Sequence, residues 1–250
     1  MITLLQAAAY HTEDAFANFT SSEAFILTII IAIAGYFVQA RLQSVFNKYS
    51  KVPSPGGMSG AEAAERMLRE NNVHNVKITH VNGHLTDHFN PQTMTVNLSD
   101  SVYESRSVAA IAVACHECGH AIQHARGYAP LELRSKLVPI VSFSSRFASW
   151  VIIGGLLLMA TTQNEIVCWV GIGMIAMSAL FSIVTLPVEY NASDRALEWM
   201  QSSRLMNAAE LEGAKTSLRW AARTYLVAAL SAIATVIYYI SIVMGNRRSN

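Results

Sequence analysis

His116-Glu117-Cys118-Gly119-His120 is the stretch around which the rest of this chain can be interpreted. The pattern predicts one helix from Ser105 to Arg126, because serines suited to an N-terminal cap precede an apolar run and a glycine follows where helices usually end. Residues four apart share a helix face, so His116 and His120 can direct two imidazoles at one metal ion. Glu117 lies one residue further round the helix, within reach of a water on that ion. This H-E-x-x-H spacing is typical of zinc metallopeptidases.

The apolar residues of the chain are clustered. They make up 52% of its 250 residues, and only 14% are charged, which is unusual for a soluble domain. Four windows of 17 to 23 residues lack Asp, Glu, Lys and Arg, namely 24–40, 147–164, 166–188 and 224–246. A bilayer core of about 30 Å needs roughly 20 helical residues. We therefore expect an integral-membrane protein, mainly α-helical, with about four transmembrane helices.

The basic residues lie mainly in two segments. Ten of the 18 Lys and Arg fall in 41–136 and five in 195–223. The positive-inside rule places both segments in the cytoplasm and the N-terminus outside, although Arg247 and Arg248 then lie on the unfavoured side. The predicted organisation is an N-terminal segment 1–23, transmembrane helices 24–40, 137–164, 166–188 and 224–246, a catalytic region 41–136 and a helical region 189–223.

The segment before the motif has the pattern of a small α+β region. Ser59 with Glu62 is a capping box that predicts a helix to about Glu70. Residues 76–81 and 93–98 alternate as strands do, and Asn82-Gly83 favours a tight turn, so we expect a small β-hairpin before the H-E-x-x-H helix. The edge of this sheet can bind substrate as an added strand, or the strands can serve packing alone.

After the third window, Pro187 is expected to end the transmembrane helix. Asn191 or Ser193 can then cap a new helix that runs to about Gln201. Asn207 with Glu210 predicts a further capped helix that continues into the last transmembrane window.

A catalytic zinc usually has three protein ligands. Two membrane crossings separate His120 from Glu189 and return the chain to the same side, so Glu189 is the favoured third ligand. His124 is an alternative, but three ligands at i, i+4 and i+8 span about 12 Å of one straight helix. Asp194 is the remaining alternative.

The chemistry expected of such a site is peptide hydrolysis, with Glu117 as general base for the attacking water. Arg195, Tyr190 and His124 are candidates for stabilising the oxyanion. Asp87 and His88 can orient a ligand, or they can belong to a turn. Cys115 and Cys118 form a C-x-x-C inside the motif helix, and we interpret them as packing residues rather than a redox pair.

The chain resembles the YugP-like family of bacterial neutral zinc metallopeptidases. The matching pieces are Leu85–His88, Ser107–Ala114, His116–His124 with Gly127-Tyr128, Pro187–Ser193 and Ala221–Tyr225. The resemblance implies a membrane-bound peptidase with a zincin-like catalytic region facing one side of a bacterial inner (cytoplasmic) membrane. In related larger membrane proteases the third ligand is a glutamate, which Glu189 matches, and an acidic residue four positions on supports the site. Here that position is Ser193, with Asp194 displaced by one.

The function expected is that of a zinc endopeptidase with one Zn²⁺ per chain. Its partners are the lipid bilayer and protein or peptide substrates, with membrane proteins as one candidate class. A net charge of +1 gives no reason to expect nucleic acid, and the sequence leaves the oligomeric state unknown. The alternative is a catalytically silent zinc-binding scaffold that binds partner proteins. A metal transporter is disfavoured, because the four windows contain no carboxylate or histidine.

Overall fold

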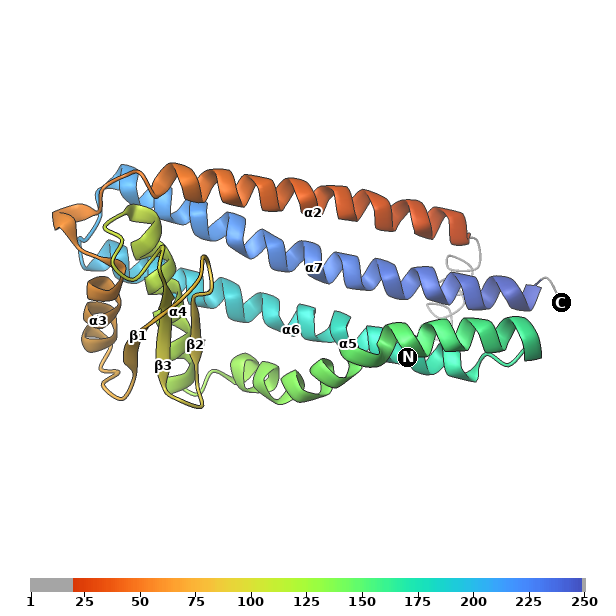
Figure 1. Ribbon diagram of the computed structural model, residues 1–250. Coiled ribbons are helices and arrows are strands. Elements are labelled where there is room, and N and C mark those ends of the chain that lie inside the picture. The colour runs from red at the N-terminus through yellow and green to blue at the C-terminus, as the bar shows by residue number, and fades with distance from the viewer. Residues whose placement is uncertain (1–19, 249–250) are drawn as a thin grey trace, which may run out of the picture. The chain divides into compact units, whose positions relative to one another are not determined.

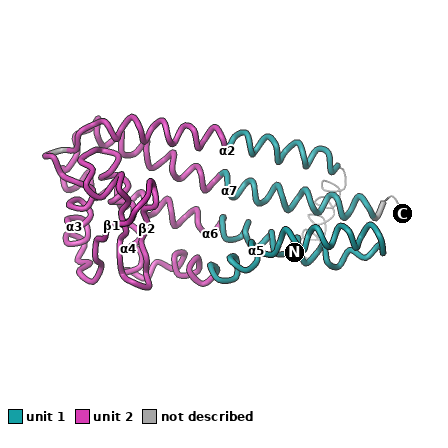
Figure 2. Tube along the Cα trace, viewed as in Figure 1, with its two compact units in different colours: residues 1–35, 137–182, 227–250 teal, residues 36–136, 183–226 magenta. Residues whose placement is uncertain are grey.

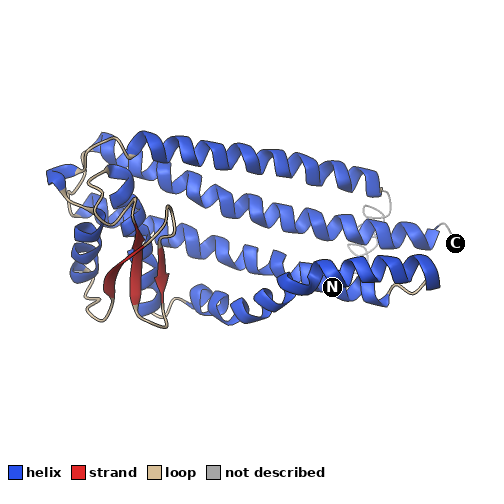
Figure 3. Ribbon diagram, in the orientation of Figure 1, coloured by secondary structure: helices blue, strands red, loops and turns tan. Residues whose placement is uncertain are grey.

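The computed structural model describes residues 20–248, so the first 19 residues of the predicted N-terminal segment lie outside it. The described chain is mainly helical, with one small sheet (Figures 1 and 3). The α-helices are α2 (Ser21–Tyr49), α3 (Gly60–Glu70), α4 (Val108–Ala125), α5 (Ala129–Thr162), α6 (Ile166–Ser202) and α7 (Ala208–Arg248). The strands are β1 (Lys77–Val81), β2 (His88–Asn90) and β3 (Thr95–Ser99), and a 3₁₀ turn covers Pro55–Gly57. The predicted fold class is confirmed.

Four of these helices, α2, α5, α6 and α7, are long and apolar enough to cross a membrane. Four candidate membrane-spanning helices are therefore present, one for each predicted window. Each helix is longer than its uncharged window, because the polar residues that flank the window also remain helical. The chain divides into two compact units, and each of the four helices contributes to both (Figure 2).

One unit comprises residues 1–35, 137–182 and 227–250. Its buried cluster is formed by apolar side chains of α5, α6 and α7, with Ile152, Ile172 and Val243 among them. A Cβ on Gly155 would lie 2.7 Å from the backbone nitrogen of Cys168, so the absence of a side chain allows α5 and α6 to approach closely. Large apolar side chains also cover the exposed surface of these helices, as expected of surfaces that face lipid.

The other unit comprises residues 36–136 and 183–226 and contains the sheet. The strand order is β1-β3-β2. β1 pairs with β3 in parallel, and β2 pairs with β3 in antiparallel fashion. The prediction of a hairpin between 76–81 and 93–98 is therefore wrong. The hairpin joins β2 to β3, and the three-residue β2 was too short to give an alternating pattern.

Helix ends follow the predicted capping chemistry at two positions. Ser59 and Glu62 form a reciprocal capping box at the start of α3. At the start of α7, the Asn207 side chain accepts from the backbone N–H of Glu210, and the Glu210 carboxylate accepts from the Asn207 N–H.

The helix predicted to begin at Asn191 or Ser193 is not a separate element. α6 continues from Ile166 to Ser202 through Pro187, which lies inside it. A proline removes one backbone hydrogen bond but does not stop a helix that is held by its neighbours. Asn191 and Ser193 consequently lie within the helix, and their side chains are available for contacts with α4.

Candidate metal centre

The H-E-x-x-H stretch lies on α4, which is buried along most of its length. Ser107 caps the N-terminus by accepting a hydrogen bond from the backbone N–H of Ala110. The helix therefore begins at Val108, three residues after the predicted start at Ser105. Arg126 forms the C-terminal cap, and Gly127 follows with a φ of 61°. The packing of α4 against α3 and the sheet therefore fixes the backbone from which the two histidines project.

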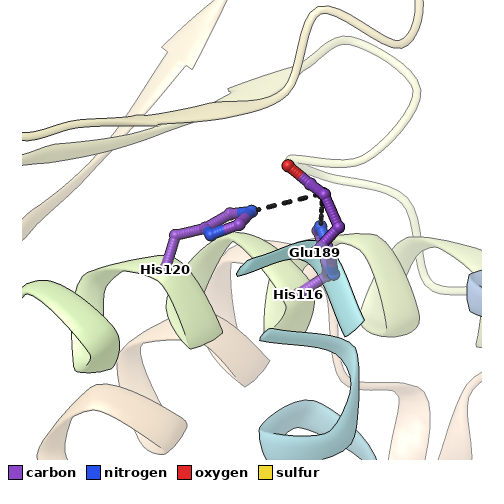
Figure 4. Close-up of side chains that lie close together, drawn as sticks. All are labelled: His116, His120 and Glu189. Atoms are coloured by element: carbon purple, nitrogen blue, oxygen red, sulfur yellow. Dashed lines mark hydrogen bonds and ion pairs between the residues drawn. The ribbon is translucent and has the colours of Figure 1, made fainter. Parts of the chain in front are cut away.

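His116, His120 and Glu189 lie together (Figure 4), with one potential ligand atom from each within 4.8 Å of the others. The Nε2 atom of His116 is 3.2 Å from Oε2 of Glu189, and the Nε2 atom of His120 is 3.6 Å from the same oxygen. All three side chains are largely shielded from solvent, and Glu189 is 1% exposed. Among the described residues, this is the group of His, Cys, Asp or Glu close enough to share one metal ion.

The donor set suits zinc. Nitrogen and carboxylate ligands bind zinc at about 2.0–2.2 Å, and a tetrahedron with such bonds places neighbouring ligand atoms roughly 3.3 Å apart. The 3.2 and 3.6 Å separations found here are close to that value. Two imidazoles and one carboxylate also leave a fourth position for water, as catalytic zinc sites require.

The outer nitrogens of both imidazoles have partners of their own. Nδ1 of His116 is 3.1 Å from the hydroxyl of Ser193, and Nδ1 of His120 is 3.0 Å from Oε1 of Gln123. Gln123 in turn donates to the carbonyl of Val188 at 2.8 Å. Such contacts fix ring orientation and leave Nε2 of each histidine for the metal. Ser193 was a predicted candidate, whereas Gln123 was missed because nothing in its sequence position marks it.

A second group missed by sequence reasoning is Arg134. Its Nη1 atom lies 3.4 Å from Oε1 of Glu189, on the opposite carboxylate oxygen from the histidines. The carboxylate therefore lies between two imidazoles and a guanidinium. Burial opposes charge on His120, but the contact with Glu189, helped by Glu117 and Gln123, outweighs it and raises the pKa of His120. The site is therefore one in which a buried negative charge attracts cations.

Glu117 lies beside the three potential ligands but does not join them. Its Oε2 atom accepts a hydrogen bond of 3.0 Å from the backbone N–H of Phe89 on β2. β2 is an edge strand, and this N–H points away from its partner β3. The edge of the sheet therefore orients the glutamate.

The remaining predicted residues are dispersed. Asp194 and His124 are exposed and outside the group of three, and the His124 ring packs 5.7 Å from that of Phe89. Tyr190 is exposed, and Arg195 donates to the Asn191 side chain.

The two predicted substrate-binding candidates lie in and next to the loop before β2. The carboxylate of Asp87 accepts bonds from the N–H and hydroxyl of Ser99, so it anchors this loop to β3. His88 is exposed and contacts the Thr86 carbonyl and the Asn97 side chain. Asp87 also lines the cavity beside the metal-binding group, whereas His88 does not.

Gly119 explains how α6 comes close enough to bring Glu189 to the histidines. A Cβ at this position would lie 2.5 Å from the backbone oxygen of Ala192. The third ligand candidate thus depends on a glycine inside the H-E-x-x-H stretch itself.

The neighbouring cysteines do not belong to the site. Cys115 and Cys118 are buried and not disulfide-bonded. Burial raises the pKa of the Cys115 thiol and, together with the nearby Cys115 and Glu117, that of Cys118. Buried, protonated thiols fit the interpretation of packing residues.

A cavity of about 210 Å³ opens beside the metal-binding group. His116, Glu117, Glu189 and Ser193 line its polar part, together with Tyr225 on α7. Tyr225 lies in the segment Ala221–Tyr225, which was part of the family resemblance. The sequence alone gave no reason to place this tyrosine at the site.

Comparison with known proteins gives a family. Residues 24–244 match the family described as "Putative neutral zinc metallopeptidase". The chain belongs to this family. A relative described as "Putative membrane protease YugP", from Bacillus subtilis (strain 168), is 39% identical over 229 residues, which cover 90% of this chain and 99% of the relative. No solved structure gives a significant match. The resemblance expected from the sequence is confirmed, and this member of the metallopeptidase family is a membrane protein.

Proposed function

We propose that this chain is an integral-membrane zinc-dependent endopeptidase. One Zn²⁺ per chain is held by His116, His120 and Glu189, and Glu117 is the general base. The observation that carries the proposal is the convergence of three ligand atoms within 4.8 Å, with Glu117 lining the same cavity. The family to which the chain belongs supports the choice of zinc and of a peptide substrate.

The residues have separate roles in this proposal. A zinc ion held there would lower the pKa of a water molecule and polarise the scissile carbonyl. Glu117 takes a proton from the attacking water and delivers it to the leaving amine. Arg134 neutralises part of the Glu189 charge, while Ser193 and Gln123 fix the orientation of the two imidazole rings.

The phenol of Tyr225 is the best-placed donor for negative charge that develops on the carbonyl oxygen. Tyr225 lines the cavity together with Glu117 and His116, whereas the sequence-based candidates Tyr190 and Arg195 do not. The same geometry removes His124 from this role, because its exposed ring packs on Phe89 outside the cavity.

We also propose that the site faces the cytoplasm and that the membrane is the bacterial inner membrane. The distribution of Lys and Arg supports this orientation: residues 41–136 and 195–223 hold most of them. The metal-binding residues belong to the compact unit made of 36–136 and 183–226, so they share the side of these basic segments.

The test compares wild type with Glu117→Gln after purification in mild detergent. Zinc per chain is measured together with cleavage of unfolded casein, and Glu104→Gln, an exposed glutamate outside the cavity, is the matched control. We expect about one zinc in all three proteins, with cleavage in wild type and the control only. Zinc in every protein without cleavage in any would instead favour the silent scaffold, and turnover by Glu117→Gln would contradict the assigned base.

A further inference from the structure

The cavity beside the metal-binding group has an apolar wall, which the hydrolysis step itself does not require. Its polar part consists of side chains already placed at the site, together with the hydroxyl groups of Ser217 and Thr224 on α7. The rest of the lining is apolar and comes from α2, the loop before β2, α4 and α7: Leu42, Phe46, Leu85, Val113, Leu218, Ala221 and Ala222. No lysine or arginine lines the cavity, and its charged residues are the acids Asp87, Glu117 and Glu189. A substrate side chain that enters here meets hydrocarbon and, at the polar end, negative charge.

Leu85 is the unusual member of this wall. It is 37% exposed, and its backbone has a φ of 56°, in the left-handed region that a bulky non-glycine residue rarely adopts. A strained backbone of this kind persists where the surrounding structure holds it, and such positions cluster at functional sites.

The loop that presents Leu85 is anchored on both sides. Before it, the backbone N–H of Gly83 donates to Asp100, and after it Asp87 accepts two bonds from Ser99. The Thr86 hydroxyl also bonds back to the Asn82 carbonyl. These bonds hold the leucine at the cavity while leaving more than a third of it exposed.

We infer that this apolar wall is a specificity subsite that accepts a bulky apolar side chain next to the scissile bond, and that Leu85 is a specificity-determining residue. The inference rests on the proposed function and names the class of peptide that it acts on. Leu85, Phe46 and Ala222 line the cavity from three different elements, so its apolar wall does not depend on one helix alone. A volume of about 210 Å³ limits the occupant to a side chain rather than a folded segment.

The test uses internally quenched peptides that differ in one residue, with leucine, phenylalanine, alanine or aspartate on either side of the scissile bond. For wild type we expect kcat/KM to be at least about 10-fold higher for leucine or phenylalanine than for aspartate, in line with discrimination by an apolar pocket. Leu85→Asn should reduce this ratio by at least about fivefold with unchanged zinc content. Asparagine tolerates a positive φ better than leucine does, so the variant should fold.

Leu133→Asn is the matched control, because Leu133 is also an exposed leucine of the same unit, at 48%, and lies outside the cavity. Equal cleavage of all peptides by wild type, or an unchanged ratio in Leu85→Asn, would overturn the inference while leaving the peptidase proposal intact.

A second readout does not depend on turnover. Fluorescence anisotropy of the labelled leucine and aspartate peptides with Glu117→Gln should show tighter binding of the leucine peptide, and Leu85→Asn in that background should reduce the difference. If wild type cleaves no peptide although it binds zinc, the proposed function fails, and the binding preference still decides whether the subsite exists. Equal binding of both peptides would remove the subsite as well.

Discussion

Gln123 is a residue that positions two of the potential metal ligands without being a ligand itself. Gln123 is fully buried and connects His120 on α4 to the backbone of α6 one residue before Glu189. The orientation of the imidazole and the position of the carboxylate therefore depend on the same side chain. The outer contacts of metal-binding histidines typically contribute about 10- to 100-fold to metal affinity.

Gln123→Met should accordingly weaken zinc binding by about 10- to 100-fold, because methionine keeps the length of the side chain but provides neither the acceptor for His120 nor the donor for Val188. Zinc affinity is measured by competition with a chromogenic chelator. Gln92→Met, an exposed glutamine in the loop after β2, is the control and should bind zinc as wild type does. Wild-type affinity in Gln123→Met would show that the contact is incidental.

The backbone N–H of Phe89 is the second residue-scale determinant. It points outward from the edge strand and holds Oε2 of Glu117. Phe89→Pro removes this donor without removing a hydrogen bond of the sheet, since prolines are tolerated on edge strands. A well-placed general base contributes roughly 10²–10⁴-fold, so we expect kcat to fall by about 10-fold or more at unchanged KM and zinc content.

Phe89→Ala separates the backbone effect from loss of the ring, which packs near His124. Alanine keeps the N–H, so its kcat should remain closer to that of wild type. Equal loss in the two variants would mean that the ring, and not the amide, is responsible.

At the residue scale, the sequence predicts the potential metal ligands and the general base better than it predicts the residues that hold them in place. His116, Glu117 and His120 follow from spacing, and Glu189 follows from the order of membrane crossings. Gln123 and Arg134 do not, because their roles come from tertiary contacts to Val188 and Glu189. The choice among His124, Asp194 and Glu189 also needed the distances, which bring only Glu189 to the two histidines.

At the scale of elements, the close approach of α4 and α6 is the feature on which the site depends. Gly119 permits it, since any side chain there would meet the Ala192 carbonyl. We expect Gly119→Ala to lower the free energy of unfolding by about 1–3 kcal/mol, the usual effect of overpacking, and to weaken zinc binding because Glu189 lies one turn from Ala192. Thermal unfolding in detergent, followed by tryptophan fluorescence, and zinc titration test both effects.

Gly173→Ala provides the comparison within α6. Nothing lies within 4 Å of a Cβ at this position, and alanine favours a helix over glycine. Its stability and zinc affinity should therefore equal or exceed those of wild type. A similar loss in both variants would point to a general intolerance of α6 or α4 to substitution rather than to the contact with Ala192.

The helices and strands also show which features local sequence patterns can predict and which they cannot. Capping boxes predicted the starts of α3 and α7, because they involve local bonds between residues three apart. The pairing of β1 with β3 is non-local and parallel, so no turn signal between them could reveal it. Asn82-Gly83 marks a turn in the loop that carries Leu85, not a hairpin. The continuity of α6 through Pro187 likewise reflects packing rather than local preference.

At the scale of the whole molecule, composition was sufficient for the main architectural prediction. Four uncharged windows predicted four membrane-spanning helices, and four helices of the described chain are long and apolar enough to cross a bilayer. Length and hydropathy suffice here because a helix in lipid forms the hydrogen bonds of its backbone N–H and C=O groups within itself. They carry no information on which end of each helix faces the cytoplasm. That assignment depends on charge alone.

The orientation can be decided by labelling two introduced cysteines in a bacterial host whose outer layers are permeable to small reagents. Glu104 and Asn164 are both exposed, the first in the segment that contains the H-E-x-x-H stretch and the second between α5 and α6. Because basic residues concentrate in 41–136 and are absent from 147–194, we expect a membrane-impermeant maleimide to label Asn164→Cys in intact cells and Glu104→Cys only after lysis. The wild-type chain, whose three cysteines are buried, provides the background. The reverse pattern would place the metal-binding residues outside the cell. Arg247 and Arg248 would then lie in the cytoplasm, as the positive-inside rule expects of basic residues.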